Sequence, residues 1–151
     1  MIRLTFDPFD PGALLSAFCR GRQEVGAVAS FTGLARAEGG EAAALELEAY
    51  PGFTEREIGK TADHARVRFG LEDVEILHRV GRIAPGDAIV FVAAAARHRR
   101  AAFEACDFLM DYLKSRAPFW KKEHGPDGAR WIAPTAQDHA DLNRWEKDSP
   151  A

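Results

Sequence analysis

The sequence predicts a single α+β domain in which a mixed or largely antiparallel sheet packs against about three helices. Two observations support this fold class. Segments with the apolar spacing of strands and of helices follow one another in the order βαβ–βα–ββα. One of them, residues 88–96, is apolar without a break, which is typical of a strand covered on both faces. Since 151 residues suit one domain with a buried core, we expect that domain to span residues 1–151, with a polar tail at 134–151 that frays at its end.

The first half of the chain is expected to contain three strands and two helices. Asp10 is suited to cap the first helix, Pro11 to occupy its first position and Gly21 to end it. Thr54 and Glu57 have the spacing of a capping box at the start of the second helix. The expected strands are 2–6, 24–36 and 44–50, the expected helices are 11–20 and 54–69, and the glycine-containing segment 37–42 is expected to be a mobile loop.

The second half is expected to contain three more strands and one long helix. Pro118 disfavours helical geometry at the residue before it, so the long helix should end there. The apolar stripe of this helix would consist of Phe103, Cys106, Met110 and Leu113. The expected strands are 74–80, 88–96 and 129–132, a turn at 84–87 joins the first two, the helix runs from about 99 to 116, and the tail after residue 134 is expected to form a further helix.

The composition argues against several classes of protein. The net charge is −3, so nothing global attracts a nucleic acid. No apolar stretch approaches the roughly 20 residues of a membrane-spanning helix, and the first residues lack the layout of a signal peptide. Cys19 and Cys106 are far apart and belong to no ligand pattern. We therefore expect a cytoplasmic protein with reduced thiols, without a metal or a cofactor, that acts neither on nucleic acid nor at a membrane.

Positive charge is concentrated in two short segments, RHRR (97–100) and WKKEH (120–124). The first falls in the opening turn of the long helix, where free N–H groups bind anions and the helix dipole disfavours cations. Four basic residues there indicate an anion site, although a solvated basic turn would have the same sequence. Arg36, which follows Gly33 at the end of a strand, is a second candidate for contact with an anion.

Lys114 follows Phe103 by 11 residues, which returns it to within roughly 20° of the apolar stripe of the helix. A lysine at that place either extends its amine to water or is partly desolvated. The chain then folds back through Phe119 and Trp120, which would set Lys121 beside Lys114 in a cleft with aromatic walls. Each ammonium would lower the pKa of the other, and such an amine can transfer protons near neutrality or act as a nucleophile.

The histidines outside the basic segments have no partner at a spacing suited to metal binding. His64, His78 and His139 are interpreted as structural or surface residues. Motifs for nucleotide phosphates, for a serine nucleophile and for a Cys/His couple are absent from the sequence. The basic segments and the lysine cleft are therefore the candidate sites.

Four segments together resemble the catalytic large subunit of molybdopterin synthase. The pattern HR-x-x-AF-x-A followed by YLK-x-x-APFWK-x-E is highly specific in combination, and the similarity runs in order over about residues 25–132. The four segments are FTGLAR (31–36), LELEAYPGFTE (45–55), HRVGRIAPGDAIVFVAAAARHRRAAFEA (78–105) and DYLKSRAPFWKKE (111–123).

This resemblance implies an enzyme of molybdenum-cofactor synthesis. The reaction would add two sulfurs to cyclic pyranopterin monophosphate and so form the dithiolene of molybdopterin. The sulfur donor would be a ubiquitin-like small subunit whose C-terminal Gly-Gly ends in a thiocarboxylate. The resemblance also implies a heterotetramer built on a central homodimer of chains like this one.

The functional positions follow from the same resemblance. Lys114 and Lys121 stand at the catalytic positions, where they would guide the anionic end of the donor, promote thiolate addition and move protons. Leu34 and Ala35 stand where a lysine and a valine are expected in many relatives, so this chain has one cation fewer there. The implied substrate-binding residues are Leu34, Ala35, Arg36, His98, Arg99, Lys122 and Glu123.

Arg99 and Lys114 lie 15 residues apart on one expected helix, so about 22 Å separates their Cα atoms along its axis. One compact pterin can hardly touch both ends in a single chain. We therefore expect a site shared across the dimer, in which His98 and Arg99 of one subunit face the lysines of the other. The alternative hypothesis is a non-catalytic module that binds a phosphorylated small molecule or RNA through the basic segments.

Overall fold

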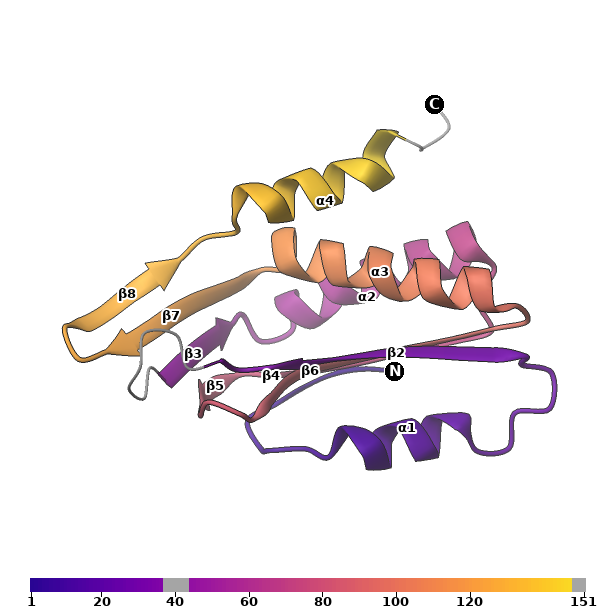
Figure 1. The fold of residues 1–151 in the computed structure, drawn as a ribbon, viewed down its shortest axis with the longest axis horizontal. Helices are drawn as coiled ribbons and strands as arrows, with labels where there is room; N and C mark the ends of the chain where they lie inside the picture. Colours follow the sequence, from indigo (N-terminus) through magenta and orange to yellow (C-terminus); the bar gives the residue numbers. More distant parts are fainter. Residues whose placement is uncertain (37–43, 148–151) are drawn as a thin grey trace.

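The computed structural model describes residues 1–36 and 44–147, and these form four helices and eight strands (Figure 1). The predicted loop at 37–42 lies outside the described residues. The elements, in chain order, are β1 (Ile2–Thr5), α1 (Pro11–Cys19), β2 (Ala27–Leu34), β3 (Ala44–Ala49), α2 (Phe53–Phe69), β4 (Asp73–Arg79), β5 (Gly81–Ile83), β6 (Ala88–Ala96), α3 (Arg99–Ser115), β7 (Phe119–Gly125), β8 (Gly128–Ile132) and α4 (Ala136–Lys147).

The first sheet has the strand order β1-β4-β6-β2 and forms the middle layer of the molecule. β1 runs parallel to β4, and the other two pairs are antiparallel. Helices α2 and α3 cover one face and α1 covers the other (Figure 1). Alternate residues of β6 serve the two faces: Val90 and Val92 pack in the cluster under α2 and α3, whereas Phe91 packs with Phe18 of α1. The uninterrupted apolar run at 88–96 is thus a strand covered on both faces, as predicted.

The second sheet is entirely antiparallel and has the order β5-β3-β7-β8. The predicted α+β class with largely antiparallel pairing is confirmed, but the strands divide between two sheets and there are four helices rather than about three. The sequence predicted no strand at β7. Its residues are mostly charged or aromatic, and only pairing with β3 and β8 on both sides makes them a strand.

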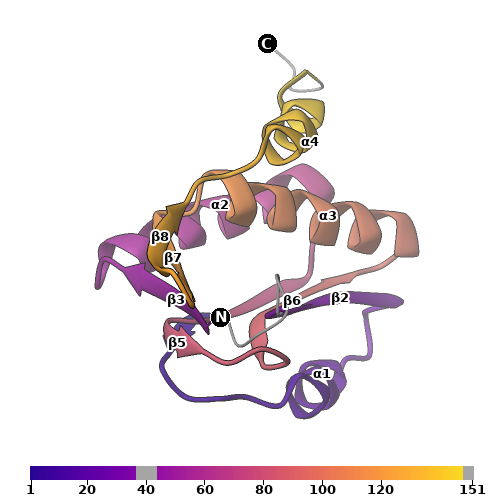
Figure 2. The ribbon, with the colours of Figure 1, turned by 60° about the vertical axis from the view of Figure 1, so that its left-hand side comes forward.

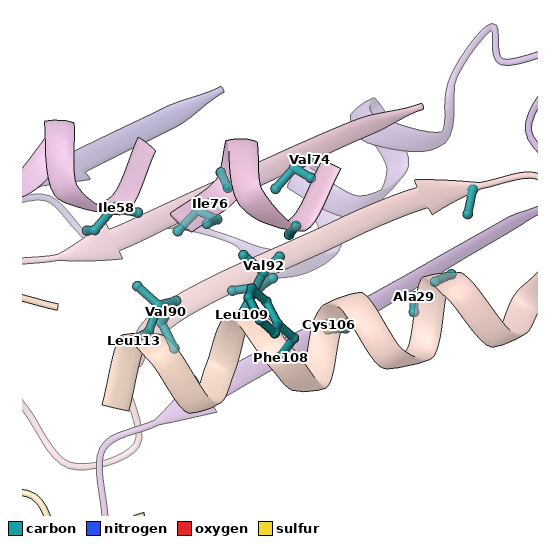
Figure 3. Packing of buried hydrophobic residues seen from close by; sticks show 14 residues of the cluster. Ala29, Ile58, Val74, Ile76, Val90, Val92, Cys106, Phe108, Leu109 and Leu113 are labelled. Atoms are coloured by element: carbon teal, nitrogen blue, oxygen red, sulfur yellow. The ribbon is translucent and has the colours of Figure 1, made fainter. Parts of the chain in front are cut away.

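The main core lies between the first sheet and the helices α2 and α3 (Figure 3). Phe108 and Leu109 of α3 are completely buried there, and burial of each such side chain stabilises the fold by about 1.5–3 kcal/mol. Cys106 and Leu113 are buried as predicted, but Phe103 is 63% exposed. The buried face of α3 begins with a small residue, Ala102, and continues through Cys106 and Leu109. Phe103 lies next to this face and not on it.

Of the two helix caps predicted from the sequence, the structure has the one at Asp10 but not the one at Thr54. Asp10 caps α1 as predicted, since its Oδ1 accepts hydrogen bonds from two backbone N–H groups at 2.9 and 3.3 Å. The capping box predicted at Thr54 and Glu57 is wrong. Gly52 occupies the N-cap of α2 with φ 80°, and its N–H donates to Glu55 Oε2 at 2.7 Å. Thr54 is buried instead, and its hydroxyl donates to the carbonyl of Pro118 at 3.1 Å.

That last hydrogen bond ties the beginning of α2 to the turn between α3 and β7. Figure 2 shows this corner, where β7 and β8 stand beside the end of α3 and the second sheet meets the first.

None of the described helices is long and apolar enough to cross a membrane.

Candidate functional site

A pocket of about 570 Å³ lies where the two sheets meet the C-terminal end of α3. Every one of its walls comes from a different part of the chain: the ends of β2, β4 and β6, the last turns of α3, β7, and the segment that links β8 to α4. The residues that line it include Gly33, Leu34, Ala35, Arg36, His78, Val90, Lys114, Phe119, Lys121, Glu123, Thr135 and Asp138.

The floor of the pocket is a row of residues on three neighbouring strands. Gly33 of β2 pairs with Val90 of β6, which in turn pairs with His78 of β4. Directly paired residues project from the same face of a sheet, so His78 and Val90 both face the helix layer. At Gly33 a Cβ atom would lie only 2.9 Å from Val90 Cγ1. The glycine therefore lets the backbone of β2 form part of the floor.

Two lysines extend into this pocket from different elements. Lys114 lies in the last turn of α3, where the helix dipole favours a cation, and Lys121 lies on β7. The pKa of Lys121 is lowered to about 8, chiefly by burial and also by the charge of Lys114 and a hydrogen bond with it, while the charge of Asp138 opposes the change. The predicted pairing of the two amines, and the lowered pKa at Lys121, are present in the structure.

Asp138 provides negative charge at the entrance to α4. Burial opposes its ionisation, but hydrogen bonds from Thr135 and the charges of Lys114 and Lys121 hold the pKa of the carboxyl below its ordinary value. The backbone N–H of Thr135 donates to Asp138 Oδ2 at 2.9 Å, and Ser115 Oγ donates to the backbone carbonyl of Asp138 at 3.1 Å. The carboxylate is therefore held in place opposite the two ammonium groups.

Four of the predicted substrate-binding residues line the same pocket. Leu34, Ala35 and Arg36 follow one another at the end of β2, and Glu123 follows Lys121 on the same face of β7. Ala35 is buried and its backbone is fixed by two hydrogen bonds to the turn at 86–87. Leu34, by contrast, is 56% exposed, so at this position the backbone rather than the side chain is held firmly.

The structure does not bring the other three predicted residues to the pocket of one chain. His98 is the N-cap of α3 and Arg99 its first residue, so both lie at the end of the helix far from Lys114, and both are exposed. Lys122 lies on the opposite face of β7 from Lys121, and its amine is 5.2 Å from the ring centroid of Trp131. Trp120, expected in the pocket wall, is on that outer face as well, because successive residues of a strand point to opposite sides.

Two ionisable residues of the pocket lining, Asp138 and His78, were not predicted as site residues from the sequence. Asp138 could not be found, because nothing local indicates that the tail returns to the end of α3. His78 gave a weak signal that was not used. It shares one face of β4 with Val74 and Ile76, both in the core, so a polar residue next in that row marks the point where the core ends.

A partly enclosed pocket that sets two amines and an arginine around a space of this size is typical of a protein that binds a small anionic molecule. Residues 4–116 match the family described as "MoaE protein". A protein of Caulobacter vibrioides named "Molybdopterin synthase catalytic subunit" is 68% identical over 149 residues, which are 99% of each chain.

Solved structures agree with the sequence comparison. A molybdopterin biosynthesis MoaE protein from Burkholderia ambifaria superposes with a TM-score of 0.82 at 48% identity, over 97% of each chain. Molybdopterin synthase from Staphylococcus aureus gives a TM-score of 0.78 at 28% identity, over 86% of this chain and 95% of the other. The chain belongs to the MoaE family.

Proposed function

We propose that this chain transfers sulfur to cyclic pyranopterin monophosphate, as the catalytic subunit of a molybdopterin synthase in molybdenum-cofactor synthesis. Membership of the MoaE family supports the reaction. The observation that carries the assignment of the site is the pair Lys114 and Lys121 in one pocket, with a pKa of about 8 at Lys121. An amine with that pKa exchanges protons near neutral pH, which an ordinary exposed lysine cannot do effectively.

The roles of the pocket residues follow from their charges. Arg36, which lies just after the end of β2 and lines the pocket, would bind the substrate phosphate, since a guanidinium forms paired hydrogen bonds with phosphate oxygens. The Lys114 ammonium would attract the thiocarboxylate of the donor. The thiocarboxylate sulfur forms a bond to a substrate carbon as a C–O bond at that carbon breaks and its oxygen leaves with a proton. Water then hydrolyses the resulting thioester, which leaves a thiolate on the substrate and frees a carboxylate on the donor. Lys121 would give and take the protons of these steps.

The sulfur donor in this proposal is a separate ubiquitin-like chain with a C-terminal Gly-Gly thiocarboxylate. Its flexible end would enter the pocket toward Lys114 and Lys121. We place the reaction in the cytoplasm, and both cysteines of this chain, Cys19 and Cys106, are free thiols.

The proposal also includes a second copy of the chain. His98 and Arg99 begin α3 and Lys114 lies in its last turn, so one pterin cannot contact both ends in one chain. In a homodimer, His98 and Arg99 of the second copy would add two basic side chains to the phosphate end of the pocket. The exposure of both residues leaves them available for this contact.

The direct test mixes the purified chain with a thiocarboxylated ubiquitin-like donor and cyclic pyranopterin monophosphate, and measures the dithiolene product. Product should form only when all three are present. Lys121→Ala should lower the rate by at least about 100-fold, as expected for loss of a group that transfers protons. Lys60→Ala is the control, because Lys60 lies on α2 in an exposed ion pair with Glu57 and does not line the pocket.

The alternative, a module that binds without catalysis, makes different predictions. A module that binds RNA would show an affinity that falls steeply with salt and rises with the length of the nucleic acid. A module that only binds a phosphorylated metabolite would bind the pterin and never form product with the donor. The proposed enzyme should bind the pterin in the Lys114→Ala variant but fail to convert it.

A further inference from the structure

His78 lines the pocket, yet the proposed chemistry gives it no role. The side chain is only 5% exposed, so what remains accessible faces the pocket. It belongs to the central strand β4, and its pairing with Val90 directs it toward the helix layer. A buried polar side chain at the wall of a pocket needs hydrogen-bond partners, either from the protein or from what the pocket binds.

Hydrogen bonding within the chain satisfies one ring nitrogen of His78. Nδ1 lies 2.9 Å from the backbone carbonyl oxygen of Arg79. A carbonyl oxygen can only accept, so Nδ1 must carry the proton, and in the neutral ring Nε2 is then an acceptor. Among the described residues, Nδ1 is the only atom of this ring that makes a hydrogen bond. Nε2 therefore has an unused lone pair.

The ring is also fixed in orientation and in charge. It stacks on Phe119 with the centroids 4.2 Å apart and the planes 26° from parallel. The pKa of His78 is lowered to about 4, chiefly by burial and also by the charges of Lys121 and Lys114, while the hydrogen bond with the Arg79 carbonyl opposes the change. The ring is therefore neutral at pH 7, and it does not become a third cation beside the lysines.

We propose that His78 is a substrate-binding residue whose Nε2 accepts a hydrogen bond from an N–H group on the ring system of the bound pterin. This inference rests on the proposed function and adds to it a contact to the heterocycle. Protonated lysines and Arg36 are hydrogen-bond donors and bind only acceptor groups of the reactants, whereas the His78 acceptor recognises an N–H donor. Phe119, which also lines the pocket, places an apolar side chain beside this acceptor.

The test measures binding of cyclic pyranopterin monophosphate to the full chain, without a sulfur donor, by titration calorimetry. His78→Phe keeps a ring that can stack on Phe119 but has no acceptor, and it should raise the Kd about tenfold, the effect of one lost hydrogen bond. His78→Gln, whose amide oxygen can reach the position of Nε2, should recover most of that affinity. His64→Gln is the control, because His64 is exposed on α2 and does not line this pocket.

A second measurement separates a direct contact from a structural effect. Nitrogen NMR of histidine-labelled protein should show protonated Nδ1 and unprotonated Nε2 at His78, and saturation with the pterin should shift the Nε2 resonance toward that of a hydrogen-bonded acceptor. An unmoved Nε2 resonance, or wild-type affinity in His78→Phe, overturns the inference while product formation by the wild type still supports the proposed function. Wild-type protein that does not bind the pterin overturns both.

Discussion

At the scale of single residues, the pocket is defined by how burial changes ionisation. His78 and Lys121 are both basic side chains that are partly shielded from water in the pocket lining, and this burial lowers the pKa of each. The consequences differ because the ordinary values differ. At pH 7, His78 is neutral, so it forms hydrogen bonds but carries no charge. Lys121 is mostly protonated at this pH, but it can lose its proton at little cost.

The neutral His78 should make the fold sensitive to acid. Its folded pKa of about 4 lies below the ordinary 6.5, so the unfolded chain binds more protons between these values. The resulting stability is fully present above pH 6.5 and is lost as the pH falls toward 4. As the pH falls through this range, the free energy of unfolding should decrease by about 3 kcal/mol less in His78→Phe than in the wild type, because the variant has no imidazole to protonate. Urea denaturation at several pH values measures it, and parallel pH profiles for the two proteins would contradict the assignment.

At the scale of elements, β7 is the main determinant of the site. It follows directly after the turn at Pro118 and pairs with β3 on one side and β8 on the other. The period of two then separates its side chains: Phe119, Lys121 and Glu123 line the pocket, while the residues between them form the outer face. This alternation explains why two adjacent lysines have different surroundings.

Helix α4 should tune the lysines through Asp138. Replacement by Asn keeps an oxygen that can accept from the Thr135 N–H but removes the charge that raises the pKa of Lys121. Asp138→Asn should therefore lower the pKa of Lys121 below about 8, by an amount that NMR titration of the lysine side chain can detect. Asp141→Asn, on the same helix but outside the pocket lining, should leave that pKa unchanged. An equal shift in both variants would rule out a specific effect of Asp138.

The sequence predicts most elements correctly where the apolar pattern is strong, as in the continuous run of β6 and the helical stripes of α2 and α3. It predicts the lysine pair because Pro118 stops α3 next to Lys114 and the chain must return. It does not predict β7 as a strand, because the segment lacks an apolar face of its own, nor the contributions of His78 and Asp138. Those depend on which strands become neighbours and on where the tail crosses the fold, and both are tertiary effects.

At the scale of the whole molecule, the long helix α3 keeps two groups of basic residues apart. Lys114 contributes to the pocket, while His98 and Arg99 lie at the other end of the helix. A dimer is the simplest arrangement that lets both groups act on one substrate. The proposed enzyme thus needs a second copy for its phosphate site and a different chain for its sulfur.

Mixed dimers test this arrangement. One subunit carries Arg99→Ala and the other Lys114→Ala, and differently tagged subunits allow the mixed dimer to be purified. If each site takes Lys114 from one chain and Arg99 from the other, one site is intact and one has both substitutions. We expect about half of the wild-type product rate. A rate equal to the mean of two control dimers, one with Arg99→Ala in both chains and one with Lys114→Ala in both chains, would show that each site is complete within one chain.

The fold brings the amines of Lys114 and Lys121 together in a partly buried pocket, and the proposed chemistry depends on this arrangement. The most direct measurement is an NMR titration of the Lys121 side chain in the wild type and in Lys114→Ala. The pKa of Lys121 should be about 8 in the wild type and higher in the variant, because the repulsion and the hydrogen bond from Lys114 are lost. An ordinary lysine pKa near 10.5 in both proteins would contradict it.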